Sequence, residues 1–243
     1  MRNWQEEKEK RVAFIQDMLR SSGAKGIVFG NSGGKDSALV AALSSAATKN
    51  VLGVMMPCAS KRNFGEDLED AKKVAEKYGI PSLIVDLTKV REELLSSLGV
   101  SLETKGALSN IAPRLRMTTL YAIGAEKGYL VAGTGNKSER YMGYFTKFGD
   151  GACDFNPIAD LTASEVFDFL RFLGAPEHVV TKAPSAGLFE GQTDESEMGV
   201  TYAEIDAFLA GEKVSEEAEK IIARYHRSSL HKMVMPTTFK DEK

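Results

Sequence analysis

The chain has 243 residues, of which 43% are hydrophobic and 27% are charged, a composition typical of a globular protein with one large domain or two small ones. The formal net charge of −3 and the pI near 5.8 argue against a nucleic-acid-binding protein held mainly by phosphate contacts. The N-terminus is too charged for a signal peptide, and no apolar run approaches the ~18 residues of a membrane span. We therefore expect a cytoplasmic protein that binds neither nucleic acid nor membrane.

The two cysteines, Cys58 and Cys153, stand far apart and belong to no CxxC pair. This spacing indicates neither a disulfide framework nor a zinc site. We interpret both as small residues of the core or of loops, in a protein of a reducing compartment.

The first half of the chain alternates between helix and strand patterns. Residues 4–21 place apolar side chains at helical spacing between charged ones, which predicts a helix that ends at Gly23. Short apolar runs predict strands at 25–30, 51–57, 81–87 and 129–135. Helices are predicted between them, at 37–48, at 64–78, through Leu98 and at 106–127, the last interrupted by Pro113.

Nearly apolar strands that alternate with helices are typical of a parallel sheet covered on both faces. We therefore predict an α/β fold, with a doubly wound, mostly parallel five-stranded sheet of the Rossmann-like kind. Ligands of such folds bind beyond the carboxyl ends of the strands. The helix at 106–127 carries Leu115, Leu120 and Ile123, which suit either a subunit contact or the core against the sheet, and we favour the core.

After Gly135 the pattern changes. Residues 136–160 are rich in Gly, Lys and Asp without a sustained period, and a second polar loop spans 183–199. Short helices are predicted at 164–173, 176–181, 202–209 and 214–225. No repeat or linker marks a boundary, so we predict one domain over 1–243, with a nucleotide-binding core in 1–135 and substrate loops and C-terminal helices in 136–243. We interpret the loops at 183–199 and beyond 225 as lids that shield a reactive intermediate from water.

The segment FGNSGGKDSALV, at 29–40, lies between the first predicted strand and the next helix. Its glycines let successive backbone N–H groups turn toward one point where a helix begins, a combination that binds anions. Ser32 and Ser37 add hydroxyl donors, and Asp36 adds a carboxylate that suits Mg²⁺. An ordinary strand-to-helix turn is the plainer alternative, but the polar residues and the place of the loop after the first strand favour a phosphate-binding loop.

Two common nucleotide loops are excluded. The segment is not a Walker A loop, because Asp36 follows Lys35 where that motif needs Ser or Thr, and it is not a G-x-G-x-x-G turn. Instead, SGGKDS resembles the pyrophosphate loop of the N-type ATP pyrophosphatases, the adenine nucleotide alpha-hydrolase-like superfamily. Those enzymes cleave ATP between its α- and β-phosphates, adenylate an acceptor and let a nitrogen or sulfur nucleophile displace AMP. Because synthetases for GMP, argininosuccinate and asparagine share the loop, it does not identify the substrate.

Later segments identify the chain as a member of the ammonia-dependent NAD synthetases, because they come in the order seen in that family. The resemblance runs from the N-terminal helix to about residue 236. The segments are NIAPRLRM (110–117), GTGNKSE (133–139), YFTKFGDGACD (144–154), PSAGLFEGQTDESEMG (184–199) and HKMVMP (231–236). Taken singly, they have plainer interpretations, such as solvated arginines, a glycine-rich turn, a mobile charged loop and a solvated terminal pair.

The resemblance implies a ligase that amidates deamido-NAD (nicotinate adenine dinucleotide) with ammonia, giving NAD, AMP and pyrophosphate through an adenylate in the final step of NAD biosynthesis. ATP is then a co-substrate and Mg²⁺ the cofactor, and the family forms homodimers with the deamido-NAD site at the interface. The implied ATP-binding residues are Gly30, Asn31, Ser32, Gly33, Gly34, Lys35, Asp36, Ser37, Thr134 and Ser185. The implied deamido-NAD-binding residues are Arg114, Lys147, Asp154, His231 and Lys232, and the implied Mg²⁺ ligands are Asp36 and Glu139.

Three positions depart from the family pattern. Ala163 stands where the family usually has a lysine that contacts ATP, and Pro113 replaces a usual alanine. Lys35 fills the variable position of the loop, and the sequence leaves open whether it reaches the phosphates. The sequence also leaves open which group accepts a proton from ammonium, with Asp150 and Asp194 as candidates.

The nitrogen source follows from the length of the resemblance. Relatives that use glutamine carry an additional amidase domain with a cysteine nucleophile, for which 243 residues already occupied by the synthetase pattern leave no room. We therefore expect ammonia as the direct donor of nitrogen, unless a separate glutaminase subunit associates.

Two other functions are alternatives to an NAD synthetase, one of them an enzyme and the other a binding module. A tRNA thiolase or GMP synthetase is a rival enzyme, although a thiolase should show reactive cysteines and a basic surface. A non-catalytic nucleotide-binding module should lack a metal carboxylate.

Overall fold

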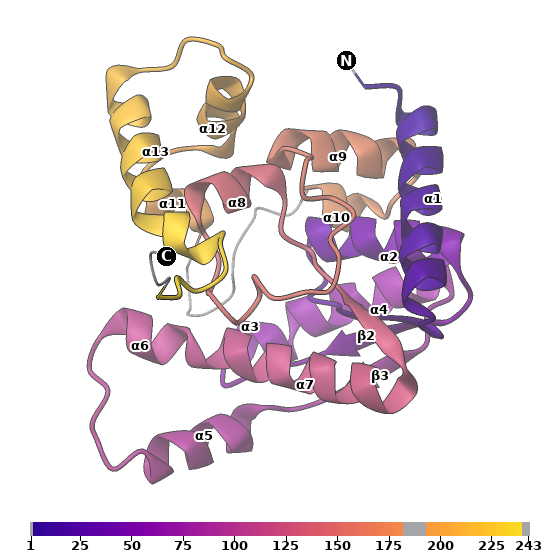
Figure 1. Cartoon of the computed structure of the whole chain (residues 1–243), viewed down its shortest axis with the longest axis horizontal. Coiled ribbons are helices and arrows are strands. Elements are labelled where there is room, and N and C mark those ends of the chain that lie inside the picture. Colours follow the sequence, from indigo (N-terminus) through magenta and orange to yellow (C-terminus); the bar gives the residue numbers. More distant parts are fainter. Residues whose placement is uncertain (1, 182–192, 240–243) are drawn as a thin grey trace.

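The structure is a computed structural model that describes residues 2–181 and 193–239. Its centre is a parallel sheet in the order β3-β2-β1-β4 (Figure 1). The strands are β1 (Gly26–Gly30), β2 (Val51–Met55), β3 (Ser82–Ile84) and β4 (Tyr129–Ala132). The chain extends the sheet from β1 toward β3 and then returns to place β4 on the other side of β1. This reversal creates a crevice beyond the carboxyl ends of β1 and β4, where such folds bind ligands.

The predicted parallel α/β fold is confirmed, but the predicted number of five strands is wrong, because the described residues form four. Next to β4, where a fifth strand would lie, a single parallel bridge joins Ala132 to Phe155. Pro157 follows closely and has no N–H to donate to a ladder. In addition, the side chain of Asn156 accepts a hydrogen bond from Ile158 N at 2.9 Å, so the chain turns away from the sheet.

The helices largely follow the predicted order. They are α1 (Trp4–Ser22), α2 (Lys35–Ala47), α3 (Lys61–Phe64), α4 (Glu66–Tyr78), α5 (Thr88–Ser97), α6 (Lys105–Ser109), α7 (Ile111–Lys127), α8 (Lys137–Met142), α9 (Ala163–Phe172), α10 (Glu177–Thr181), α11 (Asp194–Met198), α12 (Tyr202–Leu209), α13 (Glu216–Ser229) and the 3₁₀ turn η1 (Leu230–Lys232). None of those in the described ranges is both long and apolar enough to cross a bilayer.

Three helix boundaries differ from the predictions. Helices α8 and α11 lie in segments predicted as loops, and the side chains of Asn136 and Thr193 cap their first turns. The helix predicted at 106–127 breaks at Asn110 rather than at Pro113. Pro113 instead lies in the first turn of α7, where its missing N–H leaves no intrahelical bond unmade. It therefore does not shift the start of the helix that carries Arg114.

The two faces of the sheet are covered by different helices. On one face, α2 packs with α1 and α9, and Phe29, Leu39 and Phe169 are fully buried there. On the other face α7 packs against β1 and β4, and Leu115, Leu120 and Ile123 join a cluster around the strand residues. The preferred assignment of these three α7 residues to the core is thus confirmed. Helix α2 is buried over most of its length, so its N-terminus is held firmly at the crevice.

Helix α1 is tied to the segment before α9 by an ion pair. The side chain of Arg11 is buried and donates hydrogen bonds to both carboxylate oxygens of Asp160, at 2.7 and 2.9 Å. Partial burial opposes the charge of Asp160, but the bonds from Arg11 and the charge of Arg2 outweigh it and lower the pKa of this carboxyl. The pair therefore couples the N-terminal helix to the second half of the chain.

The two cysteines are free thiols, as predicted. Cys58 is buried and Cys153 is half-buried. Burial raises the pKa of both thiols, which keeps them protonated and unreactive at neutral pH. Cys153 also fills the space beside Gly133, where an added Cβ would lie 2.6 Å from its sulfur. Both thiols therefore have packing roles.

Candidate active site

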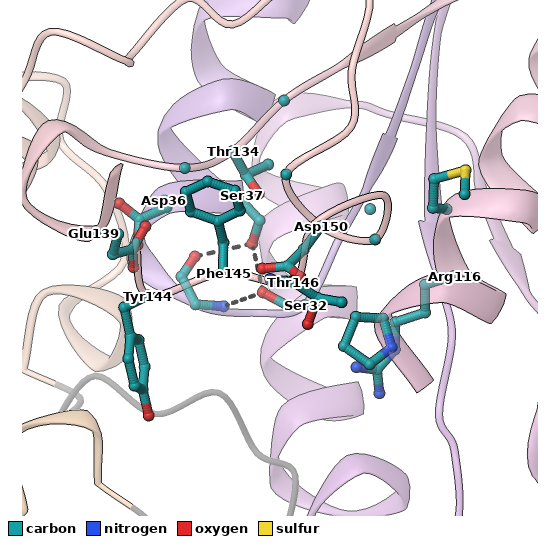
Figure 2. Close-up of a pocket in the computed structure, with 18 of the residues that line it drawn as sticks. Ser32, Asp36, Ser37, Arg116, Thr134, Glu139, Tyr144, Phe145, Thr146 and Asp150 are labelled. Atoms are coloured by element: carbon teal, nitrogen blue, oxygen red, sulfur yellow. Dashed lines mark hydrogen bonds between the residues drawn. The ribbon is translucent and has the colours of Figure 1, made fainter. Parts of the chain in front are cut away.

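A cavity of about 570 Å³ opens beyond the carboxyl ends of β1 and β4 (Figure 2). It is lined by the β1–α2 loop, the ends of β2 and β4, α7, α8, the segment at 143–153 and the C-terminal residues around Lys232. It is therefore built from both halves of the chain. Among the residues assigned to ATP, those of the β1–α2 loop from Gly30 to Ser37, apart from Gly33, and Thr134 line it. Ser185 lies outside the described residues.

The β1–α2 loop takes a shape that requires glycine. Gly33 has φ of 77°, in the left-handed region, and a Cβ added there would lie 2.6 Å from the carbonyl oxygen of Asp67 and 2.8 Å from Ala71 N. The loop is thus pressed against α4. The next residue, Gly34, is the N-cap of α2 and offers no side chain to bond the first amides of the helix. Those amides and the positive end of the helix dipole form an anion site.

The two serines of the loop close it with local hydrogen bonds. The hydroxyls of Ser32 and Ser37 lie 3.1 Å apart, and Ser37 Oγ donates to the carbonyl oxygen of Gly34 at 2.9 Å. Ser32 Oγ in turn accepts from Gly34 N at 3.3 Å. Asn31 is buried and donates to the carbonyl of Ala71, so it anchors the loop to α4. These contacts preorganise the loop for phosphate oxygens.

Asp36 and Glu139 lie side by side, as the sequence predicted (Figure 2). Asn136 joins them: its amide nitrogen donates to Asp36 Oδ1 at 3.0 Å, and its backbone N donates to Glu139 Oε2 at 3.0 Å. Burial, and next to it the charge of Asp36, raises the pKa of Glu139 to about 8. Two carboxylates forced together in this way are an arrangement that a cation stabilises.

This pair suits a hard divalent ion. The described residues contain no group of three or more His, Cys, Asp or Glu side chains that would enclose a metal. Mg²⁺ is commonly held by one or two carboxylates, with phosphate oxygens and water completing its ligands. The donor set present, two carboxylates beside a phosphate-binding loop, therefore fits Mg²⁺ bound together with a nucleotide.

The side chain of Lys35 is buried in the protein, next to the cavity. Its Nζ lies 2.5 Å from Asp36 Oδ2, and 5.6 Å from the ring centres of both Phe167 and Tyr202. Only 5% of the residue is exposed. Although burial opposes the charge, the neighbouring carboxylates, Asp36 first, raise the pKa of Lys35. The loop thus carries a buried ammonium beside the carboxylate pair.

The residues assigned to deamido-NAD fall into three places. Arg114, Lys147 and His231 form a row outside the cavity lining, in which Arg114 Nη2 donates to Lys147 O at 3.4 Å and Lys147 Nζ donates to His231 O at 2.7 Å. Lys232 lines the cavity and donates to the carbonyls of Gly143 and Phe145, at 2.8 and 2.9 Å. The structure thus brings four of the five residues to one side of the cavity.

Asp154 is the exception. Its carboxylate accepts hydrogen bonds from Val131 N at 2.7 Å and from the hydroxyl of Tyr121 at 3.2 Å, on the exposed side of β4. Burial of the ring, and then the charge of Asp154, raises the pKa of Tyr121 to about 12. Asp154 is exposed and does not line the cavity, so its predicted contact with substrate would come from outside the cavity.

Ala163 does not line the cavity. It is the first residue of α9 and is buried in a cluster with Met142 and Met198, and its N–H donates to Ser138 Oγ at 3.1 Å. Phe167, one helical turn further, lies beneath the ammonium of Lys35. The ammonium of Lys35 therefore lies against the same helix that Ala163 begins.

Sequence reasoning missed two groups of the site. Arg116 lines the cavity, donating from Nε to Met56 O and from Nη2 to Asn63 Oδ1, each at 3.0 Å, whereas the preferred Arg114 is exposed. The side chain of Asn136 was not assigned a role, although it joins the carboxylate pair. The spacing N-x-x-E of a capping box was the signal in the sequence for Asn136.

Asp150 faces the cavity from the segment between β4 and α9 (Figure 2). It accepts a hydrogen bond from Thr146 N at 2.9 Å, and Thr146 Oγ1 donates to Asn110 Oδ1 at 2.6 Å. Solvent in the cavity reaches the carboxyl, but protein atoms surround it densely, and this burial raises the pKa of Asp150. Asp194 lines the cavity too, and it accepts a hydrogen bond from the hydroxyl of Tyr202 at 3.0 Å.

Comparisons with known proteins agree with this site. The NAD synthase family matches residues 7–243. An NH3-dependent NAD(+) synthetase of Carboxydothermus hydrogenoformans is 48% identical over 96% of this chain and 97% of its own. An NMN synthetase structure from Francisella tularensis superposes with a TM-score of 0.94 at 38% identity, over 99% of this chain and 100% of that one. An NH3-dependent NAD synthetase structure from Campylobacter jejuni, in complex with the nitrate ion, gives 0.82 at 31% identity over 99% and 100%. The chain belongs to the NAD synthase family.

Proposed function

We propose that this protein is an NH3-dependent NAD⁺ synthetase, a ligase that amidates deamido-NAD to NAD with ATP and ammonia. Family membership over nearly the whole chain supports this activity. The observation that carries it is the meeting of a glycine-rich anion loop and the Asp36–Glu139 pair at one cavity. A non-catalytic nucleotide-binding module would not need that pair.

ATP binds with its pyrophosphate end on the β1–α2 loop. The amides of the first turn of α2 and the hydroxyls of Ser32 and Ser37 donate to phosphate oxygens. Thr134, which lines the cavity at the end of β4, and Ser185 complete the ATP contacts. The dipole of the buried helix α2 favours the negative charge that the leaving pyrophosphate gains.

Asp36 and Glu139 would hold Mg²⁺, which neutralises charge on the phosphates of ATP. Asn136 keeps the two carboxylates side by side through its amide and backbone nitrogens. Because the capping box of α8 fixes Asn136, the pair is held by the start of that helix. The chain thus presents the metal ligands in a preorganised position.

Deamido-NAD binds from the side of the cavity opposite the loop. The row of Arg114, Lys147 and His231 supplies positive charge and backbone contacts, and Lys232 lies at the cavity wall. These cations suit the phosphates and the carboxylate of the substrate. The nicotinate carboxylate then attacks the α-phosphorus of ATP, forming an adenylate and releasing pyrophosphate.

Ammonia next attacks the activated acyl carbon, and AMP leaves. Since ammonium predominates at neutral pH, a base must take its proton. We favour Asp150, because its carboxyl faces the cavity and burial raises its pKa, which makes it a stronger base than an ordinary aspartate. Asp194 is less suited, because it is buried, whereas Asp150 is exposed to solvent.

The active form is a homodimer in this proposal. The edge strand β3 is exposed, including Leu83 and Ile84, and α5, the next element along the chain, exposes Val90 and Leu94. Helix α5 lies alongside α7, which carries Arg114 (Figure 1). An exposed apolar edge next to a substrate arginine suits a second copy of the chain. Light scattering should give twice the chain mass, and Ile84→Glu should give monomers with weakened deamido-NAD binding.

Amidation of nicotinate mononucleotide is a second candidate. It is favoured by the close superposition, with a TM-score of 0.94, on the structure of an NMN synthetase. Both reactions activate the same nicotinate carboxylate, so the loop and the carboxylate pair serve either substrate. The two substrates differ in that deamido-NAD carries a second nucleotide, the adenylate half, for which the site must also provide contacts.

The proposal is tested by measuring amide product from deamido-NAD and from nicotinate mononucleotide, each with ammonium or glutamine. We expect NAD, AMP and pyrophosphate from deamido-NAD with ammonium, and no product from glutamine alone. Higher kcat/KM for nicotinate mononucleotide would instead establish the second candidate. Intact ATP binding without product from either substrate would refute both.

A further inference from the structure

Lys35 carries a positive charge into the interior, directly behind the carboxylate pair. Its ammonium contacts Asp36 and lies between the aromatic rings of Phe167 on α9 and Tyr202 on α12. Its side chain is 4% exposed, against 18% for Asp36. A charge removed from water in this way is stable only beside opposite charges, with some help from aromatic faces.

Three carboxyl groups provide that opposite charge. Asp36 acts by contact, and Glu139 and Asp194 act through their charges. Lys35 in turn affects Glu139. Burial and the charge of Asp36 disfavour the charged form of Glu139, whereas the charge of Lys35 favours it. Asn136 supplies hydrogen bonds to both members of the pair but no charge. In this cluster Lys35 therefore does what a bound cation would do.

We propose that Lys35 is a positioning residue, whose ammonium serves as a built-in counter-cation that holds Asp36 and Glu139 together before Mg²⁺ arrives. This inference rests on the proposed role of the pair in holding Mg²⁺. The chain itself supplies a positive charge in contact with Asp36, and Asn136 links Asp36 to Glu139, so the pair is held in a site with little water. When the divalent ion is bound, it takes over this neutralising role, so the dependence on Lys35 becomes smaller.

The test is thermal unfolding with EDTA and with excess Mg²⁺, in both cases without nucleotide. Lys35→Met removes the charge and keeps most of the side-chain length. In EDTA its Tm should fall by about 10 °C, as expected for breaking a buried ion pair. Excess Mg²⁺ should restore at least half of that loss and raise the Tm of the variant more than that of the wild type. The matched control is Lys72→Met, which breaks an exposed pair with Glu69 and should change Tm little under either condition.

A Tm loss that is the same in EDTA and in Mg²⁺ would overturn the proposal, because Lys35 would then be needed only for packing. The double variant Lys35→Met/Asp36→Asn separates charge from packing when the single variant folds poorly. In EDTA it should be more stable than Lys35→Met, since the carboxylate left without its partner is gone. A double variant no more stable than the single one, or unable to fold, would also overturn the proposal.

The two proposals fail in different ways. If the wild type forms NAD in the presence of Mg²⁺ but Lys35→Met shows no Mg²⁺-dependent recovery of Tm, the role of Lys35 is wrong and the synthetase function stands. If the wild type forms no amide product, the synthetase function is wrong. The thermal measurement does not depend on turnover.

Discussion

The loop after β1 and the segment after β4 end at the same cavity, but they are held in different ways. The first is closed mainly by bonds between residues at most five positions apart, such as those between Ser32 and Ser37, and one longer bond joins Asn31 to Ala71. The second is held by long-range bonds, from Asn136 to Asp36 across 100 positions and from Lys232 to Gly143 across 89. The loop proposed to bind phosphate is therefore determined mostly locally, whereas the region proposed to bind deamido-NAD depends on the packing of distant elements.

The largest expected effect is at the residue where the two regions meet. Asp36→Asn keeps the shape of the side chain but removes the charge that pairs with Lys35 and would hold Mg²⁺. We expect kcat for NAD formation to fall by about 10²–10³-fold or more, while the protein still folds. The control is Asp168→Asn, which breaks an exposed pair with Arg171. Activity within tenfold of the wild type would mean that Asp36 is not a metal ligand.

The close fit of the first loop against α4 can be tested at Gly33. Gly33→Ala combines a positive φ with a contact of 2.6 Å to the backbone of α4, so it should lower the free energy of unfolding by about 3 kcal/mol and abolish ATP binding. Gly79→Ala also has a positive φ but meets no atom within 4 Å. It should cost about 1 kcal/mol and leave ATP binding intact. Urea unfolding and calorimetric ATP titration measure both, and equal losses would contradict the close fit of the loop to α4.

Asn136 tests the long-range link between the regions. Both Asn136→Ser and Asn136→Ala lose the bond to Asp36, so we expect both to lose about 10–100-fold in kcat. Ser can still cap α8, so only Asn136→Ala should also lose about 1 kcal/mol of stability. Thr201→Ala removes a similar cap from α12 and should affect stability alone. Full activity of Asn136→Ser would show that the carboxylate pair needs no such bridge.

This contrast also explains what could be predicted from the sequence. The β1–α2 loop was predicted because its glycines and serines after a strand are local signals, whereas the Asp36–Glu139 pair was implied by the resemblance to the family. The fifth strand was not formed, because Pro157 and the side chain of Asn156 end the pairing after one bridge. The inward turn of Lys35 was unpredictable, since Phe167 and Tyr202 come from helices far along the chain.

The smallest effect concerns the ion pair that joins α1 to the second region. The pKa of Asp160 is lowered in the folded protein, so its charge stabilises the fold above its unfolded pKa, and this contribution is lost as pH falls through the folded pKa. Because the side chain is 57% exposed, Asp160→Asn should cost only about 1 kcal/mol at neutral pH. The difference from the wild type should begin to shrink as pH falls below about 4 and should vanish only below the lowered pKa of the folded protein. A difference that is constant with pH would assign the effect to shape instead of charge.

The central claim is that the cavity activates the nicotinate carboxylate by adenylation. The most direct test is to supply deamido-NAD labelled with ¹⁸O in that carboxylate, with ATP, Mg²⁺ and ammonium, and to analyse the AMP by mass spectrometry. If the carboxylate attacks the α-phosphorus and AMP then leaves the acyl carbon, each AMP formed with NAD carries one ¹⁸O. Unlabelled AMP would mean that ATP is cleaved by water, and the function proposed for this site would be wrong.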